Sequence, residues 1–241
     1  MATFRPVKKW LVPLTGVLLG LLIGFTLFPS QQEFEYKRWM KHLESLENGT
    51  YRIETKYTLD EASEVTTSRG YWSKERSTYR VSTPVTDGTA FTFDVYMEGD
   101  RFFVHSGDEW IQGEHSHPIW NELSPLDNPF QWGKDILPNA DEIYKIEKSK
   151  EHVVYRAVFH HLNAFDFRGT SLQEQEGTDL TMELADGLLQ SMTFTARPIR
   201  PDELSPFDRY PEHITYEISF SASADEIPSV PEEAYEAEEL E

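Results

Sequence analysis

An uncharged apolar segment near the N-terminus constrains this chain more than any other feature. It extends through nineteen residues, from Trp10 to Phe28, without a charged side chain. At about 1.5 Å of rise per residue, such a helix nearly matches a hydrocarbon core roughly 30 Å thick. The sequence therefore predicts one transmembrane helix, a signal anchor placed at residues 10–29.

The charges on either side of this segment predict its orientation. Three basic residues and no acidic residue precede it, whereas Glu33 and Glu35 follow soon after it. By the positive-inside rule, residues 1–9 remain in the cytoplasm and the chain from residue 30 onward lies outside. We expect a single-pass protein of the cell membrane with an extracytoplasmic domain.

A cleaved signal peptide is the competing interpretation, because it also combines N-terminal positive charge with an apolar run. The run here is longer than the roughly 7 to 15 residues of a signal-peptide core. Its end offers only weak peptidase sites, at Gly24-Phe25-Thr26 and Phe28-Pro29-Ser30. These two features favour a retained anchor.

Glycines recur at four-residue spacing within the predicted membrane helix, at Gly16, Gly20 and Gly24. Such spacing places three positions without side chains on one face, where a second helix can approach closely. Helix association is one interpretation. The other is that glycine is simply frequent in transmembrane helices.

Composition excludes several classes of function. The 241 residues carry a formal charge of −20 and contain no cysteine. An acidic chain without a basic stripe repels the phosphate backbone, so we expect no nucleic-acid partner. The lack of cysteine excludes disulfides, thiol nucleophiles, a lipidated cysteine and thiolate zinc sites.

Beyond residue 30 the pattern predicts one helix followed mostly by strands. Ser30 and Glu33 have the spacing of a capping box, and apolar residues then recur at three- and four-residue spacing until Asn48-Gly49. Alternation then indicates half-buried strands. This strand pattern is expected at residues 50–59, 65–75, 78–83, 91–98, 101–106, 143–159, 180–184, 188–196 and 213–221.

Three further segments differ from this pattern. Asp186-Gly187 is the clearest hairpin signal, because this dipeptide favours a type I′ turn between alternating strands. Residues 118–140 are irregular and contain four prolines, so one or two short helices are expected there. Residues 231–241 carry most of the C-terminal glutamates and are predicted to form a solvated acidic tail.

The order of these elements resembles the LolA-like superfamily of bacterial lipoprotein carriers and related Gram-positive envelope lipoproteins. A helix leads into long antiparallel strands, aromatic turns follow, and a helical patch precedes a long hairpin. The residues that carry the resemblance are Gly70-Tyr71-Trp72, Glu109-Trp110, Asn128-Pro129-Phe130, Val154-Tyr155, the hairpin 180–195 and Ile227-Pro228. The chain lacks the lipidated cysteine of the lipoprotein members, and the transmembrane helix takes its place as the anchor.

The resemblance implies a mainly β (α+β) domain over residues 30–230. Its strongly curved antiparallel sheet forms an incomplete barrel that short helices close. It also implies binding without catalysis, with a lipid or lipoprotein acyl chain as ligand. A role as a sensor or regulatory partner of a membrane or envelope protein, without a ligand cavity, is the alternative.

Aromatic side chains at alternate strand positions are the positive signal for a site. Either they fill the core of the curved sheet, or some of them line an apolar cavity. The residues expected on this inner face are Tyr51, Ile53, Phe91, Phe93, Met182, Leu184, Met192, Phe194, Tyr216 and Ile218.

The sequence assigns no catalytic residue, cofactor or metal. It contains no phosphate-binding loop, nucleophile elbow, zinc-protease motif or dinucleotide fingerprint. His115 and His117 beside Glu114 are two residues apart, as metal ligands on a strand can be, but no third ligand is identifiable and a polar loop is favoured. Asp94 and Asp166 interrupt apolar runs, and we expect both on the wetted face of a strand.

Overall fold

The computed structural model describes residues 30–240, apart from 61–64, 86–88, 124–125, 148, 150, 161, 163–164, 169, 173 and 206–209. The predicted anchor at residues 10–29 and its glycines Gly16, Gly20 and Gly24 lie outside this part. Within it, no helix is both long and apolar enough to cross a membrane.

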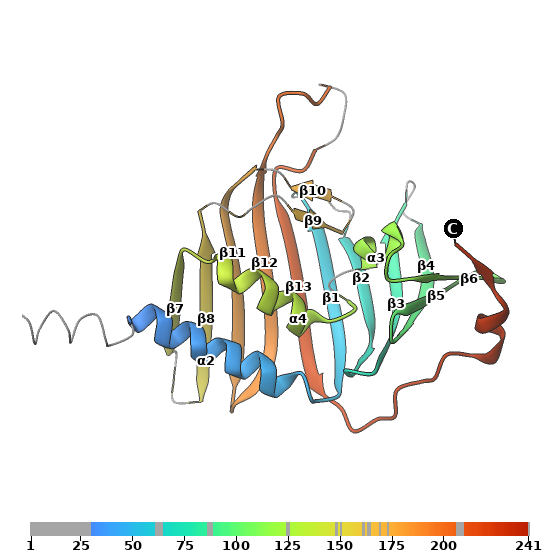
Figure 1. The fold of residues 1–241 in the computed structure, drawn as a ribbon, viewed down its shortest axis with the longest axis horizontal. Helices are drawn as coiled ribbons and strands as arrows, with labels where there is room; N and C mark the ends of the chain where they lie inside the picture. Colours follow the sequence, from blue (N-terminus) through green and yellow to red (C-terminus); the bar gives the residue numbers. More distant parts are fainter. Residues whose placement is uncertain are drawn as a thin grey trace, which may run out of the picture.

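One twelve-stranded sheet dominates the molecule (Figure 1). Its strands lie in the order β14-β6-β5-β4-β3-β2-β1-β13-β12-β11-β8-β7, so that β7 and β14 form the two edges and the sheet does not close. All pairs are antiparallel except β14 with β6. The predicted fold class, an incomplete antiparallel barrel with few helices, is confirmed.

The strands of this sheet agree with most of the predicted ranges. β6 and β14 were not anticipated, nor was β10 (Thr170–Leu172), which pairs with β9 (Phe165–Phe167) apart from this sheet. The sheet strands are β1 (Tyr51–Leu59), β2 (Val65–Trp72), β3 (Arg76–Pro84), β4 (Ala90–Glu98), β5 (Arg101–Ser106), β6 (Glu109–Glu114), β7 (Glu142–Glu147), β8 (His152–Phe159), β11 (Glu174–Ala185), β12 (Leu188–Ile199), β13 (Ile214–Ala222) and β14 (Glu238–Glu239).

Two helices cross the same face of the sheet over β7–β13 (Figure 1). Helix α2 (Gln31–Leu46) begins where predicted, because the Ser30 hydroxyl accepts the backbone N–H of Glu33 at 3.1 Å. Helix α4 (Pro129–Ile136) has an Asn128 cap, with Pro129 in its first turn. Shorter helices are α3 (Pro118–Leu123), η2 (Leu137–Asn139) and η3 (Glu232–Glu236).

The β11–β12 hairpin forms at the predicted dipeptide. Asp186 and Gly187 both have positive φ, 52° and 75°. Two consecutive positive φ angles are what a type I′ turn requires, and its twist matches that of the flanking strands. This turn therefore sets the register of the two longest strands, in which Met182 lies opposite Met192.

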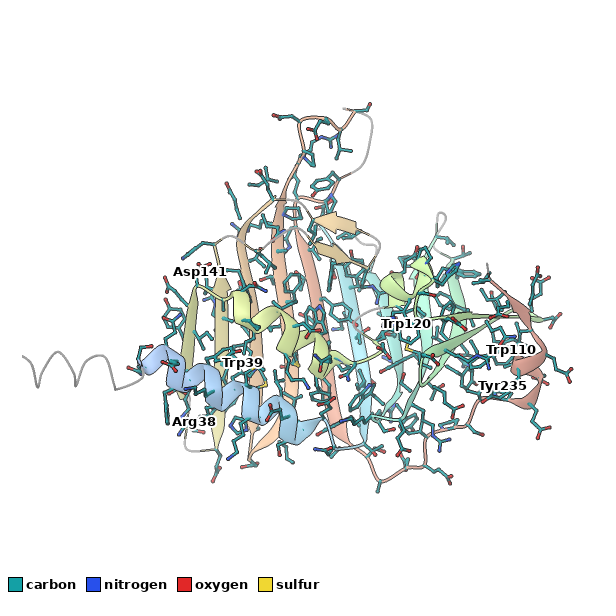
Figure 2. The ribbon with its side chains drawn as sticks, in the orientation of Figure 1. Arg38, Trp39, Trp110, Trp120, Asp141 and Tyr235 are labelled. Carbon is teal, nitrogen blue, oxygen red and sulfur yellow. The ribbon has the colours of Figure 1, made fainter. Side chains whose placement is uncertain are left out.

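The C-terminal segment corrects the prediction of a solvated tail. It packs on the outer face of β4–β6, where Ala234 is fully buried against Phe103. The Gln112 side chain donates to the carbonyl of Ala237 at 2.8 Å, and the Tyr235 hydroxyl donates to Glu98 at 2.8 Å. Glutamates dominate the segment, but alanine, tyrosine and backbone groups make these contacts. Figure 2 shows Trp110 and Tyr235 at this end of the sheet, far from Trp39 on α2.

Candidate ligand-binding site

The inner face of the sheet, which α2 and α4 cover, is a continuous apolar surface. Strand pairing places Met182, Met192 and Ile218 side by side on β11, β12 and β13. The neighbouring row on β11 to β13 is Leu180, Phe194 and Tyr216. All six are buried. Alternation along each strand, combined with the register, therefore brings residues distant in sequence onto one surface.

The ten residues predicted for this face differ in how deeply they are buried. Phe93 is half-buried against the main core, whereas Phe91 is 51% exposed. The remaining eight are fully within the core: Tyr51, Ile53, Met182, Leu184, Met192, Phe194, Tyr216 and Ile218. Their role in holding a ligand remains a prediction.

Phe91 departs from the expected burial for a physical reason. It shares the parity of Val95 and Met97, both buried, and so lies on the same side of β4. It stands near the start of the strand, however, and the ring contact recorded for it is with Phe93, at a centroid distance of 5.5 Å. Alternation fixes the side of a strand, but burial also needs a covering element.

Aromatic and aliphatic residues of the helices fill the space over the inner face. Trp39 and Leu43 of α2 and Phe130 of α4 are fully buried. From α4, the ring of Trp132 meets Phe194 edge-on, with centroids 5.5 Å apart. Much of the inner face is thus occupied by the chain's own side chains.

A hollow of about 420 Å³ lies where α2 meets the ends of β7, β8 and β11. Its floor comes from the sheet residues Val153, Tyr155 and Leu184, and the remaining lining residues are polar, charged or glycine. The complete lining is Arg38, His42, Lys145, Glu151, Val153, Tyr155, Leu184, Asp186 and Gly187. It is therefore amphipathic, with apolar sheet residues on one side and charged groups around them.

The pKa of His42 reflects the burial and the charges around this hollow. Its imidazole lies 5.8 Å from the Tyr155 ring, between centroids. Burial lowers the pKa of His42, and the positive charges of Arg38, Lys145 and Lys41 lower it further. The charged neighbours that act on this imidazole are thus cationic, although the chain as a whole is strongly acidic.

A second hollow of about 420 Å³ lies at the N-terminal end of α2. Tyr36 lines it from the helix, and Leu137, Pro138 and Ile143 line it from η2 and β7. The Gln32 side chain crosses beside it and donates to the backbone carbonyl of Asp141 at 2.6 Å. Helix α2 therefore has an open hollow on each side.

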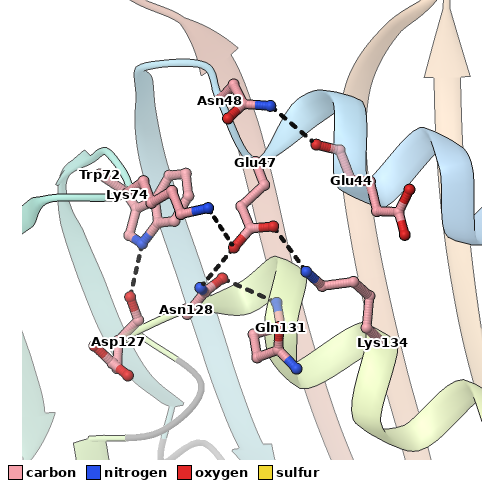
Figure 3. Close-up of polar contacts among 9 residues, drawn as sticks. All are labelled: Glu44, Glu47, Asn48, Trp72, Lys74, Asp127, Asn128, Gln131 and Lys134. Carbon is pink, nitrogen blue, oxygen red and sulfur yellow. Dashed lines mark hydrogen bonds and ion pairs between the residues drawn. The ribbon is translucent and has the colours of Figure 1, made fainter.

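A polar cluster around Glu47 joins the end of α2 to the start of α4 (Figure 3). Lys134 donates to Glu47 at 2.7 Å, Asn128 donates at 3.3 Å, and the Lys74 ammonium lies 3.9 Å away. Burial alone would raise the pKa of Glu47, but these hydrogen bonds and charges outweigh it and lower the pKa. The cluster connects both covering helices with the β2–β3 turn.

Two buried aromatic residues hold the segment before α4 against the sheet. The Trp72 indole donates to the carbonyl of Asp127 at 2.7 Å, as Figure 3 also shows, and the Tyr79 hydroxyl donates to that of Leu126 at 3.0 Å. Buried carbonyls need such partners. These bonds place Asn128, and with it the N-terminus of α4.

The polar residues singled out in the sequence lie away from this site. His117 accepts the backbone N–H of Ile119, and His115 contacts the Trp120 ring. No cluster of three or more potential metal-ligating side chains occurs in the described part of the chain. Asp94 lies on the outer face as predicted and forms a two-point ion pair with Arg80, whereas the side chain of Asp166 is outside the described part.

Sequence reasoning missed the charged side of the hollow. Arg38 and His42 are four residues apart on α2, directly before the apolar pair Trp39 and Leu43. Lys145 follows Ile143 by two positions and so shares its face of β7. Basic residues bordering an apolar stripe were the available signal.

Comparison with known proteins finds similarity in structure only. No family model and no curated sequence matches the chain. The lipoprotein LppX of Mycobacterium tuberculosis aligns with 8% identity and a TM-score of 0.47, over 80% of this chain and 97% of LppX. LprF of Mycobacterium bovis aligns with 7% identity and a TM-score of 0.39, over 81% and 96%.

A LolA superfamily protein from Nitrosomonas europaea aligns with 9% identity and a TM-score of 0.30, over 82% of this chain and 96% of its own. At these identities the similarity concerns the fold alone. This chain itself has one curved, unclosed antiparallel sheet with two helices across its inner face.

Proposed function

We propose that this chain is a membrane-anchored, extracytoplasmic binding protein of the bacterial cell envelope that catalyses no reaction and holds a hydrophobic ligand between α2 and the sheet. The observation that carries the proposal is the hollow beside α2, whose floor of Val153, Tyr155 and Leu184 continues the apolar inner face. An acyl chain in this position would bury apolar surface on both sides.

The connection of α2 to the rest of the chain supports the same function. This helix begins at Gln31, directly after the apolar segment that we propose as the anchor. Arg38 and His42, which line the hollow opposite the sheet, belong to α2. A ligand bound there would lie beside the helix that emerges from the membrane.

A second candidate function is that of a sensor or regulatory subunit for a membrane or envelope protein. The burial of residues such as Phe194 and Tyr216 favours it, because much of the inner face is already filled. The edge strand β7 also exposes Tyr144 and Ile146, at 46% and 48%. An edge strand with exposed apolar residues offers a surface for a protein partner.

Mass spectrometry of the chain extracted from its native membrane tests the two functions. Ligand binding predicts a co-purifying lipid or other hydrophobic molecule in near-stoichiometric amount. Val153→Trp, which fills the hollow, should reduce that amount. Val154→Trp on the opposite face of β8 is the matched control and should leave it unchanged. A co-purifying membrane protein without any hydrophobic molecule would instead favour the sensor function and overturn ligand binding.

A further inference from the structure

The hollow beside α2 combines positive charge with an apolar floor in an otherwise acidic protein. Arg38 and His42 enter it from α2, and Lys145 enters it from β7. The chain as a whole has 42 acidic against 22 basic residues, whereas around this hollow Arg38 and Lys145 balance Glu151 and Asp186, so the hollow is less acidic than the rest of the chain. The basic residues are grouped on the α2 and β7 side of the hollow, and that side attracts a negatively charged group.

The two sides of the hollow differ in chemistry. On the sheet side, Tyr155 is 1% exposed and contacts the ring of Trp39 at 5.7 Å. On the helix side, the Arg38 guanidinium lies over the ring of Phe34 and 3.7 Å from Glu35. A ligand that spans both sides needs a charged end and an apolar body.

Two acidic residues also lie at the rim of the hollow, where their charges would repel an anionic ligand. Glu151 and Asp186 line the hollow at the ends of β8 and β11. Both are exposed, and the backbone N–H of Asp186 donates to the carbonyl of Glu151. Water screens exposed charges of either sign, and the Arg38 side chain is itself 41% exposed. Burial lowers the pKa of His42, and the charged groups that lower it further, Arg38, Lys145 and Lys41, are all cationic.

We propose that this hollow binds the headgroup of a single-chain amphiphile with a carboxylate or phosphate group, held by Arg38, His42 and Lys145, while its chain lies along Val153, Tyr155 and Leu184. A volume of about 420 Å³ is near the lower end of the range of ligand sites, which fits one chain rather than two. This inference rests on the proposed ligand-binding function and adds the class of ligand.

The full chain in phosphatidylcholine nanodiscs tests the inference with two probes. These are 11-(dansylamino)undecanoic acid and its methyl ester, which has the same chain without the charge; empty nanodiscs provide the blank. A headgroup site predicts that the acid binds about tenfold more tightly than the ester, because charge-assisted hydrogen bonds are the stronger ones. If neither probe binds, the proposed function itself fails; if both bind equally, only the headgroup site is overturned.

Two charge-matched double variants test whether the preference for the acid over the ester arises in this hollow. Arg38→Gln with Lys145→Gln removes two positive charges from the hollow and should reduce the acid-to-ester ratio nearly to one. Lys37→Gln with Lys56→Gln removes two exposed positive charges elsewhere and should leave the ratio unchanged. If the first double variant still prefers the acid to the ester, the assignment of the headgroup site to this hollow is overturned.

The pKa of His42 gives a second readout, measured in the parent chain. An anionic headgroup beside the imidazole stabilises its protonated form, so the acid should raise the pKa of His42 whereas the ester should not. Histidine NMR titration measures this, with His42→Gln for assignment. Inorganic phosphate is the third arm: if it raises the pKa of His42 at the concentrations at which the acid does, the site binds free anions and the amphiphile assignment is overturned.

Discussion

The two halves of the sheet differ in which face is covered by other segments of the chain. In the half formed by β7–β13, α2 and α4 cover the inner face, and residues such as Phe194 and Tyr216 are buried beneath them. In the half formed by β3–β6, Phe91 of the inner side is exposed at the strand start, while Phe103 is buried on the outer face by the C-terminal segment. Identical alternation therefore leads to different burial, because distant segments decide which face is covered.

The largest expected difference between the halves concerns two phenylalanines. Phe194→Ala should lower the free energy of unfolding by about 3 to 5 kcal/mol, because the ring is fully buried against Trp132 and Phe167. Phe93→Ala should cost less than about 1.5 kcal/mol, because this ring is only half-buried and leaves no closed cavity. Urea denaturation of the full chain measures both.

Equal losses for the two variants would show that the halves are covered alike. A small loss at Phe194 combined with reduced uptake of a hydrophobic probe would indicate that the inner face is an open cavity. Large destabilisation without any probe uptake by the parent chain would eliminate the carrier function.

The second prediction concerns the cover of the other half. Ending the chain after Pro231 should lower the free energy of unfolding by about 2 to 3 kcal/mol, because Phe103 becomes exposed and the side-chain NH2 of Gln112 loses its carbonyl acceptors. Tyr235→Phe, which removes only the hydrogen bond to Glu98, is the control and should cost less than about 1 kcal/mol. An unchanged melting temperature of the shortened chain would restore the expectation of a solvated tail.

Sequence patterns predicted what depends on local geometry. The inner-face placement of Ile53, Met182 and Tyr216 follows from a two-residue period. The hairpin at Asp186-Gly187 follows from the preference of this dipeptide for the two positive φ angles that the structure shows. The cap at Ser30 is equally local, because donor and acceptor are three residues apart.

Contacts between distant segments could not be predicted in this way. Ala234 lies on Phe103 from more than a hundred positions away, and nothing in a glutamate-rich segment marks one alanine as buried. The hollow likewise requires Arg38 and Lys145 to meet, and each alone is an ordinary surface charge. Periodicity predicts on which side of a helix or strand a residue lies, but only the folded structure shows which distant residue it contacts there.

The third prediction concerns the cluster that joins α2 to α4 in the covered half. Glu47→Gln should lower the free energy of unfolding at pH 7 by about 1 to 3 kcal/mol, because Lys134 loses its charged acceptor in a site where both side chains are little exposed. Glu44→Gln on the exposed side of the same helix is the control and should change it by less than about 0.5 kcal/mol.

The pH dependence of this effect has a definite sign. The pKa of Glu47 is lowered in the folded chain, so its contribution is fully present above the ordinary pKa of a glutamate. It is lost as the pH falls through the lowered pKa, where the carboxylate becomes protonated in the folded state too. The difference between the parent chain and Glu47→Gln should therefore shrink between pH 5 and about pH 3. A difference that stays constant over this range would show that the charge of Glu47 does not stabilise the cover.

The smallest expected effect tests how tightly α4 fits over the covered half. A Cβ at Gly133 would lie 2.9 Å from the terminal methyl of Met192 and 3.5 Å from Leu43. The methionine end can move, and alanine favours the helix over glycine by about 1 kcal/mol, so Gly133→Ala should change the free energy of unfolding by less than about 1 kcal/mol. Gly133→Val is the overpacked control and should cost about 1 to 3 kcal/mol. If Gly133→Ala is as damaging as Gly133→Val, α4 is fixed rigidly on Met192. The cover could then not yield to a ligand at this point, and entry would be limited to the hollows beside α2.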